Sequence, residues 1–157
     1  MTGALWDRGS WTLDNCSVVN ALDVIGNRIS LLLIREALLG TSRFDDFAAR
    51  IGISESAAAK RLTELTTAGV LERRPYRDPK QRERHEYLLT QKGSELRVIV
   101  TALRDWGDTW ASGESGPPFH VIHRDCGSTV HAEVRCTRGH SVSRSEADLI
   151  AGPELDS

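Results

Sequence analysis

The sequence predicts an α+β fold, and three observations lead to that prediction. Four segments in the first half have apolar residues at helical spacing, and each ends at or just before a glycine. Two β-favouring segments joined by a charged turn come next. A long stretch with heptad spacing follows them. Within 157 residues we therefore expect four helices, a β-hairpin and a long helix, in that order.

The first two expected helices cover residues 18–25 and 28–39. Asn15, Cys16 and Ser17 precede the first one as capping candidates. Leucine and isoleucine occur on nearly all sides of the second segment. A helix that is apolar all round is buried, so we expect residues 28–39 to form the central helix.

The third and fourth expected helices are separated by a tight turn. Residues 44–51 form a short helix closed by Gly52, and Ser54 is the N-cap of a helix that runs to residue 67. At 100° per residue one side of this fourth helix is apolar and is expected to face the core: Ala58, Leu62 and Leu65. The opposite side is small and polar, with Arg61 on its flank: Ser56, Lys60, Thr63 and Thr67.

Residues 70–76 and 85–90 are predicted to be the strands of the hairpin. The segment between them, residues 77–84, contains Asp-Pro and too many charges to be core. The long helix is expected over residues 91–111. Its apolar residues are spaced by 3, 4, 3 and 4, which is typical of helices that pack along one another as dimers: Leu96, Ile99, Leu103, Trp106 and Trp110.

The net charge of −2 hides an uneven distribution. Residues 1–59 sum to −2, residues 60–86 to +3 and residues 87–157 to −3. A local basic patch matters more for phosphate binding than the total, because charges beyond a Debye length are screened. Charge alone would favour a solvated, charged hairpin over a phosphate-binding one.

This order of elements is typical of a winged helix-turn-helix with a C-terminal dimerisation helix. A helix fits the major groove, so residues 54–67 are predicted to read duplex DNA, while the hairpin reaches the backbone or the minor groove. The predicted DNA-binding residues are Ser54, Ser56, Lys60, Arg61, Lys80, Arg82 and Arg84. The competing interpretation is a winged-helix protein-interaction module that does not bind DNA. An enzyme is not expected, since no catalytic triad, phosphate-binding loop or paired carboxylates are found.

Residues 16–110 closely resemble the HxlR family of bacterial winged-helix regulators, which are relatives of the MarR type. The resemblance rests on residues 16–26, 31–40, 43–47, 53–54, 61–65, 68–74, 86–93 and 103–107. It implies a homodimer, a dyad-symmetric operator and regulation of nearby genes, and we expect a repressor. This sequence departs from the family in having Glu55 and Ser56 where Pro and often Arg follow the Ile-Ser of the groove helix. It also has Ile29 in place of the usual tryptophan.

Members of that family commonly have a cysteine at the position of Cys16, and some use it as a thiol sensor. A thiol at a helix N-terminus is activated because the helix dipole favours the thiolate. The alternative is a small apolar residue that fills a gap beneath the first helix. The sequence leaves both open, together with an unidentified small-molecule effector.

Residues 1–112 are expected to form the DNA-binding and dimerisation domain, followed by a linker over residues 113–118. Residues 119–157 are predicted to form a small β-rich, zinc-ribbon-like module with a polar tail. Two knuckle-like pairs could supply the four ligands of a structural zinc ion: His123, Cys126, Cys136 and His140. Gly139 stands where longer relatives have the last cysteine, so a disulfide between the cysteines or a metal-free core is the alternative.

The remaining expectations concern location. No signal peptide is visible, and no apolar run approaches the roughly 18 residues that span a bilayer, so no membrane partner is expected. Three cysteines do not make a disulfide framework. A cytoplasmic protein is therefore predicted.

Overall fold

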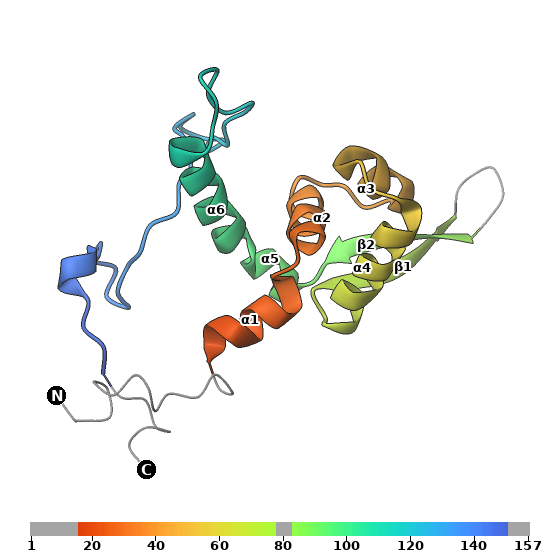
Figure 1. Cartoon of the computed structure of the whole chain (residues 1–157), viewed down its shortest axis with the longest axis horizontal. Coiled ribbons are helices and arrows are strands. Elements are labelled where there is room, and N and C mark those ends of the chain that lie inside the picture. Colours follow the sequence, from red (N-terminus) through yellow and green to blue (C-terminus); the bar gives the residue numbers. More distant parts are fainter. Residues whose placement is uncertain (1–15, 78–82, 151–157) are drawn as a thin grey trace, which may run out of the picture.

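A computed structural model describes residues 16–77 and 83–150 of the chain (Figure 1). Its helices and strands follow the predicted order. The elements are α1 (Ser17–Ile25), α2 (Arg28–Leu38), α3 (Phe44–Ile51), α4 (Glu55–Thr67), β1 (Leu71–Arg77), β2 (Glu83–Leu89), α5 (Gln91–Glu95), α6 (Arg97–Trp110) and the short 3-10 helix η3 (Arg144–Glu146). The α+β winged-helix fold is confirmed.

Helix α2 is the centre of the fold, as predicted. It contacts α1, α3, α4, α6 and β2 (Figure 1). Leu33 and Ile34 are fully buried, whereas Leu39 just beyond its end is 57% exposed. The buried apolar core consists of Ile25, Leu33, Ile34, Phe47, Leu62, Leu65, Val70 and Leu71. Among the described residues no single helix is long and apolar enough to cross a membrane. Helices α1 and α2 reach that length and hydropathy only when taken together, and the two are bent by 78° relative to each other.

The hairpin strands pair in antiparallel register from Leu71 opposite Leu89 to Arg77 opposite Glu83. The segment before α3 joins the hairpin as an isolated bridge between Arg43 and Glu86. Phe47 of α3 packs edge-on against Tyr87 of β2, with ring centroids 6.5 Å apart. These contacts hold the hairpin against the helices, so the orientation of its base is fixed by the core.

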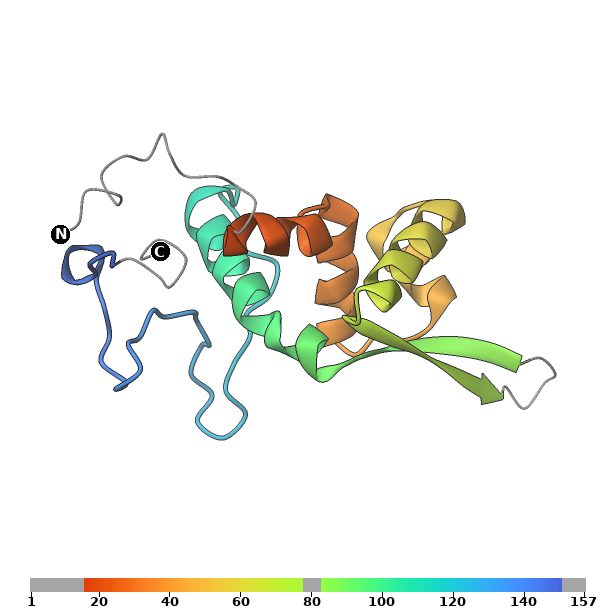
Figure 2. The same cartoon turned by 90° about the horizontal axis from the view of Figure 1, so that it is seen from below.

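The uninterrupted helix expected over residues 91–111 is wrong in one respect, because it breaks at Leu96 into α5 and α6. Leu96 has turn geometry, with φ −64° and ψ −10°. Helix α5 is tied to the winged-helix body, since Lys92 Nζ donates to the Ala68 carbonyl at 2.8 Å. Leu96 itself packs against the core, together with Val100. The break therefore lets α5 follow the hairpin while α6 extends away from it (Figure 2).

The β-rich module expected beyond residue 118 is also corrected. Residues 119–142 contain two isolated bridges, Ile122 with Thr129 and Arg135 with Ser141, and no regular strand. Each bridge closes a small turn around a glycine with positive φ, Gly127 at 69° and Gly139 at 85°. The alternating apolar residues that suggested strands have no sheet of this chain to join, so they form an extended arm.

Candidate nucleic-acid interface

The exposed face of helix α4 is small and polar. Which face is exposed follows from the turn before the helix and from the side of the helix that packs on the core. Gly52 ends α3 with φ 71°, a conformation that other residues rarely adopt. The Oγ atom of Ser54 then caps α4 by accepting the Ala57 N–H at 3.2 Å. Ala58, Leu62 and Leu65 are buried, as predicted. Ser56, Ala59 and Lys60 are exposed on the other side.

Three of the four predicted DNA-binding residues of α4 and its N-cap have side-chain partners close by in the sequence. Arg61 Nη1 lies 2.5 Å from Glu64 Oε2, one turn further on. The hydroxyls of Ser54 and Ser56 lie 3.1 Å apart. The exposed Ser56 and Lys60 are thus the side chains of α4 best placed to meet base edges. Their contact with DNA stays a prediction.

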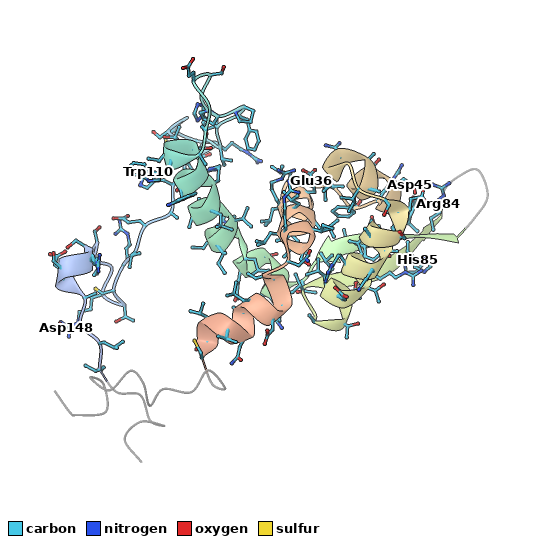
Figure 3. All side chains as sticks on the ribbon, in the orientation of Figure 1. Glu36, Asp45, Arg84, His85, Trp110 and Asp148 are labelled. Atoms are coloured by element: carbon cyan, nitrogen blue, oxygen red, sulfur yellow. The ribbon has the colours of Figure 1, made fainter. Side chains whose placement is uncertain are left out.

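The hairpin tip was predicted to supply three cations. Lys80 and Arg82 lie outside the described residues. Arg84 is on β2, where its Nη1 atom is 3.3 Å from Asp45 Oδ2 at the start of α3 (Figure 3). Both side chains are more than half exposed. An exposed pair of this kind contributes at most about 1 kcal/mol, so a phosphate could replace the carboxylate as the partner of Arg84.

A groove between the start of α3 and the hairpin was missed by the sequence analysis. It has a volume of about 350 Å³ and is lined by Arg43, Phe44, Asp45, Arg73, Tyr76, Arg84, His85 and Tyr87. The Arg43 guanidinium stacks over the Tyr76 ring, 5.3 Å from its centroid. Arg73 Nη2 is 2.9 Å from His85 Nδ1. The lining thus contains three guanidinium groups and one carboxylate, and this positive charge favours an anion in the groove.

The sequence contained only part of the signal for this groove. Arg73 lies in the basic third of the chain, but Arg43 lies thirty residues earlier, in a segment with net negative charge. The two meet because the Arg43–Glu86 bridge places the start of α3 beside β2. A contact between residues so far apart in the sequence produces no local sequence pattern from which it could be predicted.

The predicted dimerisation seam is largely uncovered in the single chain. Helix α6 has no buried residue. Four of the five predicted seam residues are exposed on one face: Ile99 at 40%, Leu103 at 51%, Trp106 at 63% and Trp110 at 74%. Leu96, the fifth, packs on the core of its own chain instead. Val98, and Val18 and Leu22 of α1, are further exposed apolar residues that the heptad pattern did not include.

Cys16 is the N-cap of α1, as predicted. Its side chain is half-buried and makes no capping hydrogen bond. The half-buried thiol is neither enclosed in the core, as the packing alternative requires, nor fully accessible. Whether it senses oxidants stays a prediction.

The four candidate zinc ligands do not converge. Across residues 16–77 and 83–150, no three His, Cys, Asp or Glu side chains lie close enough to share a metal ion. His123 Nδ1 and Cys126 Sγ are 3.2 Å apart, while Cys136 and His140 belong to the second turn, where the Cys136 N–H donates to the His140 carbonyl. The three cysteines are free thiols. Hydrogen bonds from the Ser128 hydroxyl and N–H lower the pKa of the Cys126 thiol.

The chain is similar in sequence to a family of known proteins. Residues 24–115 match the HxlR-like helix-turn-helix family. An uncharacterized HTH-type transcriptional regulator of Mycobacterium tuberculosis (strain H37Rv) is 36% identical over 139 residues, which are 87% of this chain and 86% of the relative. A regulator of the same description from Synechocystis is 31% identical over 101 residues, covering 64% of this chain and 73% of the relative.

Solved structures show the same fold. PA1607, a proposed transcription factor, is 29% identical with a TM-score of 0.79, over 88% of this chain and 96% of that one. The redox regulator HypR in its reduced form is 30% identical with a TM-score of 0.53, over 59% of this chain and 90% of that one. The similarity to PA1607 thus extends well beyond the part shared with HypR.

Proposed function

Because this chain belongs to the HxlR-like helix-turn-helix family of transcriptional regulators, we propose that it binds a dyad-symmetric operator in duplex DNA as a homodimer and represses transcription there. The helix-turn-helix of α3 and α4 would enter the major groove. Two copies would reach successive turns of one duplex, about 34 Å apart. We place this activity in the cytoplasm.

The observation that supports DNA binding is that two suitable surfaces occur in the same domain. Helix α4 exposes a face of small polar side chains with one lysine, Lys60. The groove between the start of α3 and the hairpin supplies Arg43, Arg73 and Arg84. Side chains on the helix can read bases while arginines hold phosphates, which is how regulators of this type divide specificity from affinity. The Glu55 side chain in the first turn of α4 would repel a phosphate there, which leaves the backbone grip to the groove.

The homodimer is supported by the exposed apolar face of α6. Ile99, Leu103, Trp106 and Trp110 form a row that water would otherwise cover. Large exposed apolar patches mark interaction sites, and an isologous contact buries the same patch on both partners. Aromatic residues such as the two tryptophans are the usual anchors of such interfaces.

Arg73→Ala and Lys60→Ala are expected to weaken DNA binding in different ways. Loss of Arg73 removes a phosphate contact, so affinity should fall about 3- to 10-fold on every duplex, and the slope of log affinity against log salt should shrink by about 1 for each half-site. Loss of Lys60 should instead change which duplex is preferred. Fluorescence anisotropy on a panel of duplexes at several salt concentrations measures both effects.

Arg138→Ala provides the matched control, because it removes the same charge from an exposed position. Arg138 belongs to residues 133–150, a stretch that lies on the side of α6 facing away from the hairpin (Figures 1 and 2). This variant should leave affinity and salt slope unchanged. Uniform losses from both test variants would mean that α4 is not the groove helix. A parent protein whose binding ignores salt would support the competing protein-interaction module, which is held by apolar contacts.

Redox control through Cys16 is a second candidate activity. Cys16 lies directly before α1, whose Val18 and Leu22 are exposed beside the proposed interface, so the two thiols of a dimer could meet near the dyad. The similar chain HypR is described as a redox regulator. Disulfide formation would release two protons and pass two electrons to an added oxidant such as diamide.

Diamide is expected to change the operator affinity of the parent at least fivefold, within the usual range of allosteric coupling, whereas Cys16→Ser should not respond. Gel-shift titration with and without oxidant measures the change. Cys126→Ser is the control, because this free thiol lies beyond α6 and not beside α1, so its oxidation should not affect the response. An unaltered response in Cys16→Ser would exclude the sensor.

A further inference from the structure

Residues 119–150 form an extended segment, called here the C-terminal arm, that buries nothing within its own chain. None of its side chains is buried, and only Ala132 and Val142 are partly covered. Seven large apolar side chains of the arm are exposed: Phe119, Val121, Ile122, Val130, Val134, Leu149 and Ile150. Ordering such a segment costs conformational entropy that its own contacts cannot offset, so something outside this chain has to cover it.

The arm is nevertheless anchored at one point, on α6. Arg104 Nη2 donates to the Val130 carbonyl at 2.5 Å, and the Ala132 N–H donates to Asp105 Oδ2 at 2.7 Å. Burial alone would raise the pKa of the Asp105 carboxyl, but the Ala132 N–H and the Arg104 guanidinium together hold it below its usual value. The carboxylate is therefore ionised at neutral pH and able to keep residues 130–132 of the arm on α6.

Beyond this anchor the arm extends away from the helices of its own chain. Within the described part of the molecule, no hydrogen bond or ion pair joins residues 133–150 to the elements α1 to α6. Figures 1 and 2 both show this stretch on the side of α6 that faces away from α3, α4 and the hairpin. Residues 133–150 therefore lie on the side of α6 where a partner of this helix would bind.

The exposed large apolar side chains of the described residues fall into two groups, with one exception. Besides the seven of the arm, another seven lie on α1 and α6: Val18, Leu22, Val98, Ile99, Leu103, Trp106 and Trp110. Leu39 is the one large exposed apolar residue elsewhere in the described part of the chain. The arm and the α1–α6 surface are adjacent, because the arm begins close to the end of α6.

We propose that in the homodimer the C-terminal arm of each protomer lies across α1 and α6 of the other copy, against the exposed apolar residues that the contact between the two α6 helices leaves uncovered, so that the two arms are exchanged. This inference rests on the proposed homodimer and names the second surface of its interface. A two-fold contact covers both sets of apolar residues at once, whereas a foreign protein would need to match each set separately.

The similarity to PA1607 agrees with an ordered arm. Residues 1–118 make up about three quarters of the 157 residues, so a match that covers 88% of the chain includes part of the arm. The TM-score of the whole match is 0.79 at 29% sequence identity. The alignment thus includes part of the arm together with the winged-helix body.

A photo-cross-linking experiment tests the exchange in the full-length protein. Val134→p-benzoylphenylalanine places the probe at an apolar residue, 71% exposed in the single chain, and Thr137→p-benzoylphenylalanine places it at the nearby polar turn as the control. Equal amounts of ¹⁵N-labelled and unlabelled protein are mixed, irradiated and digested. The expected result is a mixed-isotope cross-link from position 134 to a peptide of α1 or α6, and a much weaker one from position 137.

Sedimentation of the same samples separates the two proposals. Dimers whose position 134 cross-links only within its own chain, or not at all, would overturn the exchanged arm while the homodimer stands. Monomers at micromolar concentration would overturn both. In an independent measurement Val134→Asp should weaken dimerisation about tenfold and Thr137→Asp less than twofold, since a charge at a buried contact costs at least 1.4 kcal/mol. Equal values for the two variants would also contradict the exchange.

Discussion

Trp106→Asp is expected to leave the protein monomeric at micromolar concentration and to lower its affinity for a two-half-site operator by at least about 100-fold. Trp106 is 63% exposed at the middle of the row formed by Ile99, Leu103 and Trp110. A tryptophan at the centre of an interface commonly contributes 2 kcal/mol or more, and a buried carboxylate adds a desolvation cost. The second half-site is then no longer bound at high effective concentration, so affinity falls steeply.

Analytical ultracentrifugation and anisotropy titration measure the two effects on one sample. Trp106→Phe is the matched control, because it keeps an aromatic apolar side chain and should remain a dimer with affinity within a few-fold of the parent. Circular dichroism should be the same for all three proteins, since Trp106 contributes nothing to the core of its own chain. A dimeric Trp106→Asp protein with parental DNA affinity would show that α6 is not the interface.

Gly93→Ala is expected to destabilise the fold by about 3 kcal/mol and to lower Tm by about 10 °C. A Cβ atom at this position would lie 2.1 Å from the Val70 carbonyl oxygen and 2.9 Å from Leu89 Cδ2. The carbonyl cannot move away freely, because it accepts the Thr90 N–H at 3.1 Å. Helix α5 would have to separate from the hairpin base to make room.

Gly113→Ala separates this effect from the general effect of replacing a glycine. No atom outside its chain neighbours lies within 4 Å of a Cβ at Gly113, so the control should melt within about 2 °C of the parent. Differential scanning calorimetry at one protein concentration gives both values. Equal melting temperatures for the two variants would mean that α5 does not pack tightly on the body.

Gly93 and Trp106 lie at the two ends of the connection between the winged-helix body and the proposed dimer interface. Gly93 allows α5 to lie against the hairpin, and the break at Leu96 then directs α6 away from the body. Trp106 lies on the part of α6 that is directed outward. A dimer formed through α6 would therefore set the distance between two copies of α4, which is the quantity that an operator with two half-sites requires.

Local signals predicted most of the fold. Ser54 as an N-cap, Gly52 as the end of α3 and the buried side of α4 each depend on residues within one or two turns, and the structure confirms all three. The family resemblance over residues 16–110 is confirmed as well, because its motifs are local in the same sense. The sequence by itself determined the order of the elements and the regulator family.

Tertiary structure decided what depends on contacts between distant segments. The groove of Arg43, Arg73 and Arg84 forms only when the start of α3 pairs with β2. Heptad spacing could not tell that Leu96 faces the core while Trp106 is exposed, since the pattern gives one face and not what covers it. In the same way, alternating apolar residues beyond position 118 predicted strands, but a regular strand needs a neighbour along its length, and the described residues offer only two isolated bridges there. Periodicity specifies which side chains share a face, whereas the packing of the whole chain determines what that face meets.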